Sequence, residues 1–198
     1  MNRAVFLDRD GVINELVYHR EQEVIDSPFT PGQFKLIPDV TEALKIIHNN
    51  GYLAIIVSNQ PGIAKGHMTE ETFELIRQKM VSEMRVEGIE LDREYYCFHH
   101  PDSVAEKYRV RCECRKPLPG LLFTAARENN IDLKESWLIG DNLSDIEAGK
   151  AAGCRTVLIG TLKCELCRLM SKKNTFPDKI AENMGNAVRN HILPKRSI

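Results

Sequence analysis

Hydrophobic residues gather in five short runs along the chain. These runs predict strands at positions 4–7, 53–57, about 95–96, 137–140 and 156–159. The run at 53–57 is apolar at every position, which is typical of a strand buried on both faces of a parallel sheet. The chain therefore reads as a series of buried strands separated by longer polar segments.

Between these runs, apolar residues repeat at the spacing of an α-helix. Thr69 can cap one such helix, since Glu70 and Glu71 follow it, and Gly153 can end another. The repeats predict helices at about 40–50, 69–84, 119–126 and 143–152.

Two long segments lack a clear pattern. Breakers such as Pro28 and Pro31 predict a loop between Gly11 and about Pro38. The tail, about 164–198, is weakly patterned, and we expect one short helix there near 182–189. Strands that alternate with helices predict an α/β protein: a Rossmann-like fold with a mostly parallel sheet and helices on both faces, in one domain over 1–198.

The composition excludes several classes of protein. Of the 198 residues, 42% are hydrophobic and 28% charged, which excludes disorder over most of the chain. A formal net charge of −1 argues against a nucleic-acid-coating protein. No apolar run approaches the roughly 20 residues that cross a bilayer, and the first residues lack a signal-peptide pattern. We expect a cytoplasmic monomer without nucleic-acid or membrane partners.

Polar side chains follow three of the predicted strands directly. Asp8 and Asp10 follow the first strand, Ser58 and Asn59 the second, and Asp141 the fourth. The carboxyl ends of parallel strands meet at one edge of the sheet, where ligands bind. Neighbouring carboxylates repel unless a cation offsets their charge, and Mg²⁺ prefers such oxygen ligands. We therefore expect a magnesium site here, although Asp8 and Asp10 alone are equally typical of a simple turn.

A cluster of cysteine and histidine residues occupies the middle of the chain. Cys97, His99, Cys112 and Cys114 offer four ligands of the kind that hold a tetrahedral Zn²⁺. His100 is an alternative ligand to His99, and buried thiols without a metal are the other interpretation.

A second pair, Cys164 and Cys167, lies in the tail. It is either a redox pair, half of another zinc site, or two unpaired thiols.

Four motifs occur in the order D-R-D-G-V, S-N, R-K-P and G-D-N-L-S-D, three of them directly after an apolar run. In this order they resemble the motifs of the haloacid dehalogenase (HAD) superfamily of phosphohydrolases, over about residues 4 to 160. The resemblance implies that Asp8 is the nucleophile and Asp10 the general acid and base. Ser58 and Asn59 would bind the transferring phosphoryl group, and Lys116 would pair with Asp8.

The same resemblance assigns the magnesium ligands. Asp8, Asp141 and the main-chain carbonyl of Asp10 would hold Mg²⁺. Asp145, one helical turn further, would either steady the metal from outside or be an ordinary acid on the helix face.

The string Y-Y-C-x-H-H-P … C-x-C-R-K-P-x-P-G resembles the zinc-loop branch of the HAD superfamily. This implies a structural zinc loop at about 97–114 in place of a large cap domain. The stretch N-Q-P-G-I-A-K-G also resembles that branch, whereas the loop around 27–31 is longer than in it. The resemblance implies that this loop borders the distal end of the substrate, so its length leaves the identity and anomer of the sugar open. We expect Gln60, Arg115 and Asn142 to contact the substrate beside Asn59.

The branch implies a sugar-phosphate substrate. Removal of the 7-phosphate of a heptose 1,7-bisphosphate is favoured, and histidinol phosphate is the alternative substrate. A non-catalytic, zinc-stabilised sugar-phosphate-binding protein is the alternative outside enzymes.

Overall fold

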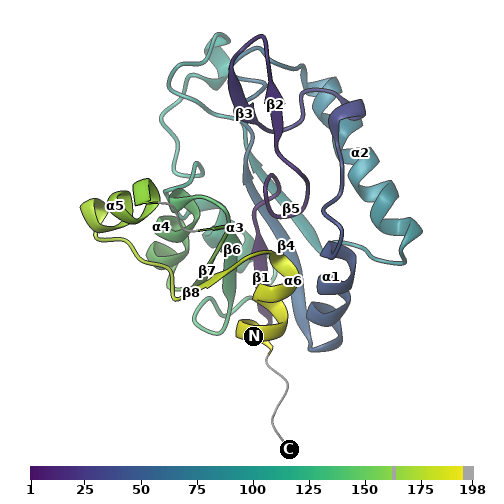
Figure 1. The fold of residues 1–198 in the computed structure, drawn as a ribbon, viewed down its shortest axis with the longest axis vertical. Helices are drawn as coiled ribbons and strands as arrows, with labels where there is room; N and C mark the ends of the chain where they lie inside the picture. Colours follow the sequence, from purple (N-terminus) through teal and green to yellow (C-terminus); the bar gives the residue numbers. More distant parts are fainter. Residues whose placement is uncertain (162–163, 194–198) are drawn as a thin grey trace, which may run out of the picture.

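A computed structural model describes residues 1–161 and 164–193 of the chain (Figure 1). Its centre is a six-stranded sheet in which all neighbouring strands are parallel. This confirms the predicted α/β, Rossmann-like fold. In spatial order the strands are β5 (Arg93–Cys97), β4 (Tyr52–Asn59), β1 (Arg3–Leu7), β6 (Trp137–Gly140), β7 (Arg155–Ile159) and β8 (Lys179–Ala181).

Helices cover both faces of this sheet, as the sequence predicts. On one face the core joins the sheet to α1 (Val40–Asn49), α2 (Glu70–Val86) and α6 (Met184–Ala187). On the other face it joins the sheet to α3 (Gly120–Glu128) and α4 (Leu143–Ala152), and α5 (Cys164–Lys173) packs beside α4.

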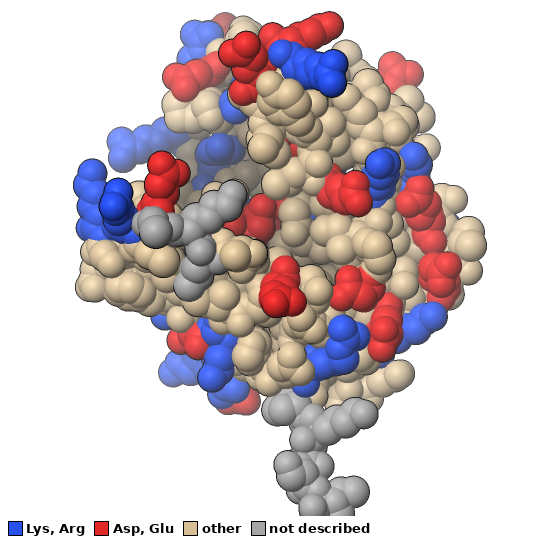
Figure 2. All heavy atoms as spheres, in the orientation of Figure 1, with Lys and Arg blue, Asp and Glu red and all other residues tan. Residues whose placement is uncertain are grey.

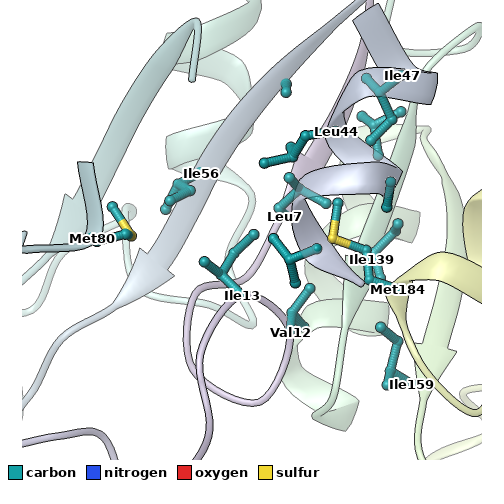
Figure 3. Packing of buried hydrophobic residues seen from close by; sticks show 14 of the residues in the cluster. Leu7, Val12, Ile13, Leu44, Ile47, Ile56, Met80, Ile139, Ile159 and Met184 are labelled. Carbon is teal, nitrogen blue, oxygen red and sulfur yellow. The ribbon is translucent and has the colours of Figure 1, made fainter. Parts of the chain in front are cut away.

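Neighbouring residues of one strand enter different cores. Leu7 and Ile56 pack with Leu44 of α1 in the first core (Figure 3). Phe6 and Ile55, one position earlier in each strand, belong to the second core. All five side chains are fully buried. Because both faces are covered, these strands are apolar at successive positions, which is why they could be recognised.

Helix ends follow the predicted signals. The Thr69 side chain accepts a hydrogen bond of 3.0 Å from the backbone N–H of Thr72 and caps α2. Gly153 ends α4 with a φ of +84°, a conformation that favours glycine.

The segment expected to be a loop between Gly11 and Pro38 contains a hairpin, so that prediction was wrong in part. Its strands β2 (Val17–His19) and β3 (Val24–Asp26) pair in antiparallel fashion. Each strand has three residues, and Tyr18 and Ile25 are 59% and 68% exposed. Such short, exposed strands leave no buried run in the sequence. The hairpin stands above the carboxyl edge of the sheet (Figure 1).

The tail is also more regular than expected. The strand β8 adds an edge to the sheet, and α5 precedes it. The predicted helix near 182–189 is α6, which continues as a π-helical turn over Val188–Ile192. Of the three residues of β8 only Ala181 is buried, so no apolar run marks this strand.

Charged side chains of both signs are interspersed over the face in Figure 2, in keeping with the net charge of −1. Within the described residues, no helix combines the length and the apolar character needed to span a bilayer.

Candidate active site and metal centre

Three carboxylates meet at the carboxyl edge of the sheet. Asp8 follows β1 and Asp141 follows β6, and these strands are neighbours. The backbone N–H of Asp8 donates to the carbonyl of Ile139 over 2.9 Å, which ties the two strand ends together. Asp145 comes from the first turn of α4, and one carboxylate oxygen of each aspartate lies within 4.8 Å of the others.

Two glycines leave space for these carboxylates. Gly11 has a φ of +80°, and a Cβ atom there would lie 2.3 Å from Oδ2 of Asp141. At Gly140, a Cβ atom would lie 2.3 Å from Cγ of Asp145. Any side chain at either position would therefore displace a carboxylate.

Lys116 supplies the positive charge that faces this group. Its Nζ lies 3.0 Å from Oδ1 of Asp8 and 2.6 Å from Oδ1 of Asp145. Asn59 holds the lysine in place, because its side-chain amide exchanges two hydrogen bonds of 3.0 Å with the backbone of Lys116. The motif containing Lys116 and the end of β4 are thus fastened to each other beside the carboxylates.

The carboxylates carry more charge than one lysine offsets. Burial, then the charges of Asp8 and Asp145, raises the pKa of Asp141 to about 7. Burial raises the pKa of Asp145 to about 6, although Lys116 opposes the shift. Burial alone would lower the pKa of Lys116, but Asp145 and Asp8 raise it above its ordinary value. Three oxygen donors with excess negative charge suit a hard divalent cation such as Mg²⁺.

The carboxylate of Asp10 lies outside this group of three. Its Oδ2 accepts a hydrogen bond of 2.6 Å from Nε2 of Gln60, which also donates to Oγ of Ser58 over 3.1 Å. The predicted magnesium ligands were Asp8, Asp141 and the main-chain carbonyl of Asp10, and the carboxylates that cluster here are those of Asp8, Asp141 and Asp145. Asp145 is fully buried and pairs with Lys116, and its Oδ2 also accepts the backbone N–H of Asn142 over 3.0 Å in the first turn of α4, so it belongs both to the helix end and to the carboxylate group.

A pocket of about 310 Å³ opens at this edge of the sheet. It brings together most of the predicted site residues with four residues from the hairpin region. From the predicted set it is lined by Asp8, Asp10, Asn59, Arg115, Lys116, Asp141 and Asn142, and from the hairpin region by Leu16, Ile25, Asp26 and Ser27. Ser58 and Gln60 are buried and do not line the pocket. Gln60, which was expected to contact the substrate, donates from Nε2 to Oδ2 of Asp10.

The four predicted zinc ligands also lie together. The ligand atoms of Cys97, His99, Cys112 and Cys114 are all within 4.8 Å of one another. The Sγ of Cys97 lies 3.7 Å from that of Cys112 and 3.2 Å from that of Cys114, and Nδ1 of His99 lies 3.3 Å from the Cys114 sulfur. Four soft or borderline donors in this arrangement fit a closed tetrahedral zinc site.

The alternative ligand His100 lies outside this cluster, and its Nδ1 accepts the backbone N–H of Asp102 at 3.1 Å. Cys97 ends β5, and burial raises the pKa of its thiol. Arg115 follows the cluster directly, and its Nη1 donates to the carbonyl of His99 over 3.2 Å. The cluster therefore fixes the position of Arg115, whose side chain lines the pocket.

Two features of the site escaped the sequence interpretation. The hairpin strands left no signal because they are short and exposed, although the loop around 27–31 was expected to border the substrate and Ser27 lines the pocket. Arg9 and Asn14, which both bind the Asp10 carboxylate, are completely buried. A charged residue inside D-R-D-G, between two carboxylates, was the one sequence signal that could have indicated Arg9. In the tail, Cys167 is exposed, and the Cys164 side chain lies outside the described residues.

Comparisons with known proteins agree with this geometry. Residues 113–187 match the model of the HAD-hydrolase-like family. The D-glycero-beta-D-manno-heptose-1,7-bisphosphate 7-phosphatase of Photorhabdus laumondii is 43% identical over 161 residues, or 81% of each chain. The enzyme of that name from Pasteurella multocida is 41% identical over 82% of this chain and 84% of its own.

Among solved structures, the D,D-heptose 1,7-bisphosphate phosphatase from B. bronchiseptica, complexed with magnesium and phosphate, is similar in fold. Its TM-score is 0.74 with 27% sequence identity, and the match covers 94% of this chain and 96% of that one.

Proposed function

The chain belongs to the HAD-like phosphatases, in the family of the D-glycero-beta-D-manno-heptose-1,7-bisphosphate 7-phosphatases, and from this we propose that it removes the 7-phosphate of a heptose 1,7-bisphosphate. The observation that carries the proposal is the group formed by Asp8, Lys116 and Asp141 at the end of the parallel sheet. It combines a carboxylate nucleophile, a buried ammonium and a place for a divalent cation.

The proposed reaction proceeds through an aspartyl phosphate. One carboxylate oxygen of Asp8 attacks the phosphorus, and the bond from phosphorus to the sugar oxygen breaks. Asp10 gives its proton to that departing oxygen. Asp10 then takes a proton from water as the water oxygen attacks the phosphorus, which frees Asp8 and inorganic phosphate. Lys116, 3.0 Å from Asp8, offsets negative charge that develops on the phosphoryl group.

Magnesium fits the cluster of hard oxygen donors. We assign Asp8 and Asp141, with the main-chain carbonyl of Asp10 and with Asp145 beside them, to hold it. When bound, the ion supplies positive charge at the phosphoryl oxygens. Zinc fits the cluster of Cys97, His99, Cys112 and Cys114, where four protein ligands complete its coordination, and its role is therefore structural.

Arg115 supports the choice of a bisphosphate. It lines the pocket next to Lys116, and its guanidinium can bind a second phosphate through two parallel hydrogen bonds. Asn142 lines the same pocket and is assigned to substrate contact. Ser58 and Asn59 are assigned to binding of the phosphoryl group. Gln60 is assigned to support of the Asp10 carboxylate, because its side-chain amide donates to Oδ2 of Asp10.

The test is phosphate release from a panel containing heptose 1,7-bisphosphate, the matching 7-monophosphate and histidinol phosphate, with Mg²⁺ present. We expect the highest kcat/KM for the bisphosphate, and Arg115→Ala should remove most of its advantage over the monophosphate. Asp8→Asn should lower activity more than about 10³-fold on every ester, because an amide cannot form the acyl phosphate. Asp102→Asn, an exposed acid with a side chain 90% accessible, is the matched control.

Three results would contradict the proposal. Preference for histidinol phosphate would move the substrate to the alternative within this branch. Equal kcat/KM for bisphosphate and monophosphate would remove the role of Arg115. If the unaltered chain binds these phosphate esters but releases no phosphate from them, it is a sugar-phosphate-binding protein and not an enzyme.

A further inference from the structure

Arg9 is the largest completely buried side chain of the described residues, and it lies between the two aspartates of the first motif. A buried guanidinium is costly unless its charge and its N–H groups are paired. Nothing in the reaction proposed above uses Arg9. Its burial beside two carboxylates at the pocket therefore calls for a physical reason.

One side of the guanidinium is bound to Asp10. Its Nη2 donates to Oδ1 of Asp10 over 3.0 Å and its Nε over 3.3 Å, so two donors of one rigid plane converge on a single oxygen. The side chain of Asp10 is 11% exposed, while that of Arg9 is 0% exposed. The contact is therefore sheltered from water on the arginine side and open to the pocket on the aspartate side.

Two buried amides complete the support of Asp10. Nδ2 of Asn14 donates to Oδ1 over 2.9 Å, and Nε2 of Gln60 donates to Oδ2 over 2.6 Å. Both residues are completely buried, as Arg9 is. Oδ1 thus accepts three donors and Oδ2 accepts one. The crowded oxygen fixes the orientation of the carboxylate, and Oδ2 keeps room to bind a proton.

The other side of Arg9 lies over an aromatic ring. Its Cζ lies 5.4 Å from the centroid of the Phe73 ring, in α2. Phe73 in turn packs edge-on against Tyr96 of β5, with ring centroids 5.0 Å apart. Nη1 of Arg9 has no hydrogen-bond partner among the described residues, so that end is held by packing. Arg9 therefore packs against Phe73 of α2, which Tyr96 of β5 supports, while its polar edge binds Asp10.

This arrangement explains why the carboxylate of Asp10 lies outside the carboxylate cluster, although Asp10 follows Asp8 by only two residues. Without a cation, a turn that carries both aspartates would leave like charges close together. We propose that Arg9 is a positioning residue for proton transfer, which holds the Asp10 carboxylate away from the metal-binding aspartates and directs it toward the leaving oxygen. The inference rests on the proposed function, since it takes Asp10 as the general acid.

The test compares two phosphate esters that need a general acid to different degrees. Departure of p-nitrophenolate needs little protonation, whereas departure of an alkoxide from an alkyl phosphate needs it strongly. The parameter is kcat/KM, which covers the steps up to leaving-group departure. We expect Arg9→Met to lower kcat/KM about 10- to 100-fold for the alkyl ester and about threefold or less for p-nitrophenyl phosphate. Arg9→Lys, which keeps the charge without the paired donors, should recover part of the loss.

Asp10→Asn provides the reference, and it should show the same selective loss. In the Asp10→Asn background, Arg9→Met should have little further effect, because both changes remove one function. Arg77→Met is the control, since Arg77 pairs with Glu94 and lines a hollow together with the same aromatic residues, Phe73 and Tyr96. It should not change the difference between the two esters.

The outcomes separate two failures. If Asp10→Asn lowers kcat/KM equally for both esters, Asp10 is not the general acid, and this inference fails together with that part of the proposed function. The positioning role alone is overturned if Asp10→Asn is selective for the alkyl ester but Arg9→Met lowers kcat/KM equally for both esters. It is also overturned if Arg9→Met has its full effect on kcat/KM in the Asp10→Asn background. Should Arg9→Met not fold, Arg9→Lys carries the same comparison, and a non-selective loss there also overturns the inference.

Discussion

Single side chains of the site differ in how completely their charge is offset. Lys116 is buried and faces two carboxylates directly, at 3.0 Å from Asp8 and 2.6 Å from Asp145. Asp141 has no such direct partner among the described residues, although the positive charge of Lys116 opposes the rise in its pKa. Burial and the neighbouring carboxylates therefore act on Asp141 most strongly, and its pKa of about 7 falls within the range where the enzyme would work.

We predict that magnesium affinity and stability change with pH in opposite directions. Asp141 must lose its proton to bind a cation, so the apparent affinity for Mg²⁺ should weaken as pH falls below about 7, by up to about tenfold per pH unit. Without metal, the pKa of Asp141 is higher in the folded chain than its ordinary 3.8. The folded state then binds more protons than the unfolded state, so stability should fall as pH rises from about 4 to about 7.

Calorimetric titration with Mg²⁺ and melting curves in EDTA from pH 5 to 8 measure both effects. Asp141→Asn should flatten the pH dependence of Tm in EDTA and bind Mg²⁺ weakly at every pH. A Tm in EDTA that rises with pH over this range, in the unaltered chain but not in Asp141→Asn, would contradict the prediction.

Individual elements show which signals a sequence carries. The strands β1, β4, β6 and β7 are buried on both faces, so their apolar runs were readable. Caps and stops also worked, as Thr69 and Gly153 show. The hairpin and β8 failed for a common reason: each strand has three residues, mostly not buried. β2 and β3 pair with each other and β8 pairs with β7, but strands this short and exposed form no apolar run that a sequence pattern could record.

The segment from Cys97 to Lys116 acts as one element because the Cys/His cluster ties its two ends together. We predict that Cys112→Ser, by opening the zinc site, raises KM several-fold and lowers Tm even in excess Mg²⁺, since Arg115 and Lys116 follow the cluster directly.

Brief EDTA treatment of the unaltered chain should instead abolish activity, and Mg²⁺ alone should restore it, because thiolate-bound zinc leaves slowly.

Cys167→Ser is the matched control, because Cys167 is exposed and lies outside the cluster. Elemental analysis should find about one zinc per chain in the unaltered protein and the control. Purified protein that is free of zinc yet stable and fully active would overturn the structural role of this metal.

For the molecule as a whole, topology decided how much of the site could be predicted. Parallel strands carry Asp8, Asn59 and Asp141 to one edge, so knowing the strand ends was enough to bring these residues together. The contacts of Asp145 and Arg9 could not be predicted in this way. Both are buried charges whose partners come from other elements or from side-chain orientation, and sequence spacing gives neither.

The fold also separates what stabilises the chain from what shapes the pocket. Ile56 is completely buried in the core between the sheet, α1 and α2, while Ile25 is 68% exposed and lines the pocket from β3. We predict that Ile56→Ala lowers the free energy of unfolding by about 2–5 kcal/mol, because it leaves a cavity in the core. Ile25→Ala should change it by less than about 0.5 kcal/mol.

Activity should respond in the reverse order. At a temperature where both variants are folded, Ile25→Ala should raise KM for the sugar phosphate while Ile56→Ala leaves KM nearly unchanged, since only Ile25 faces the pocket. Denaturant unfolding with steady-state kinetics on the same preparations measures both quantities, and Ile180→Ala, a residue 38% exposed in β8 and away from this pocket, controls for loss of a partly exposed isoleucine. An Ile25→Ala variant that loses stability but keeps its KM would show that the hairpin supports the fold and not the substrate.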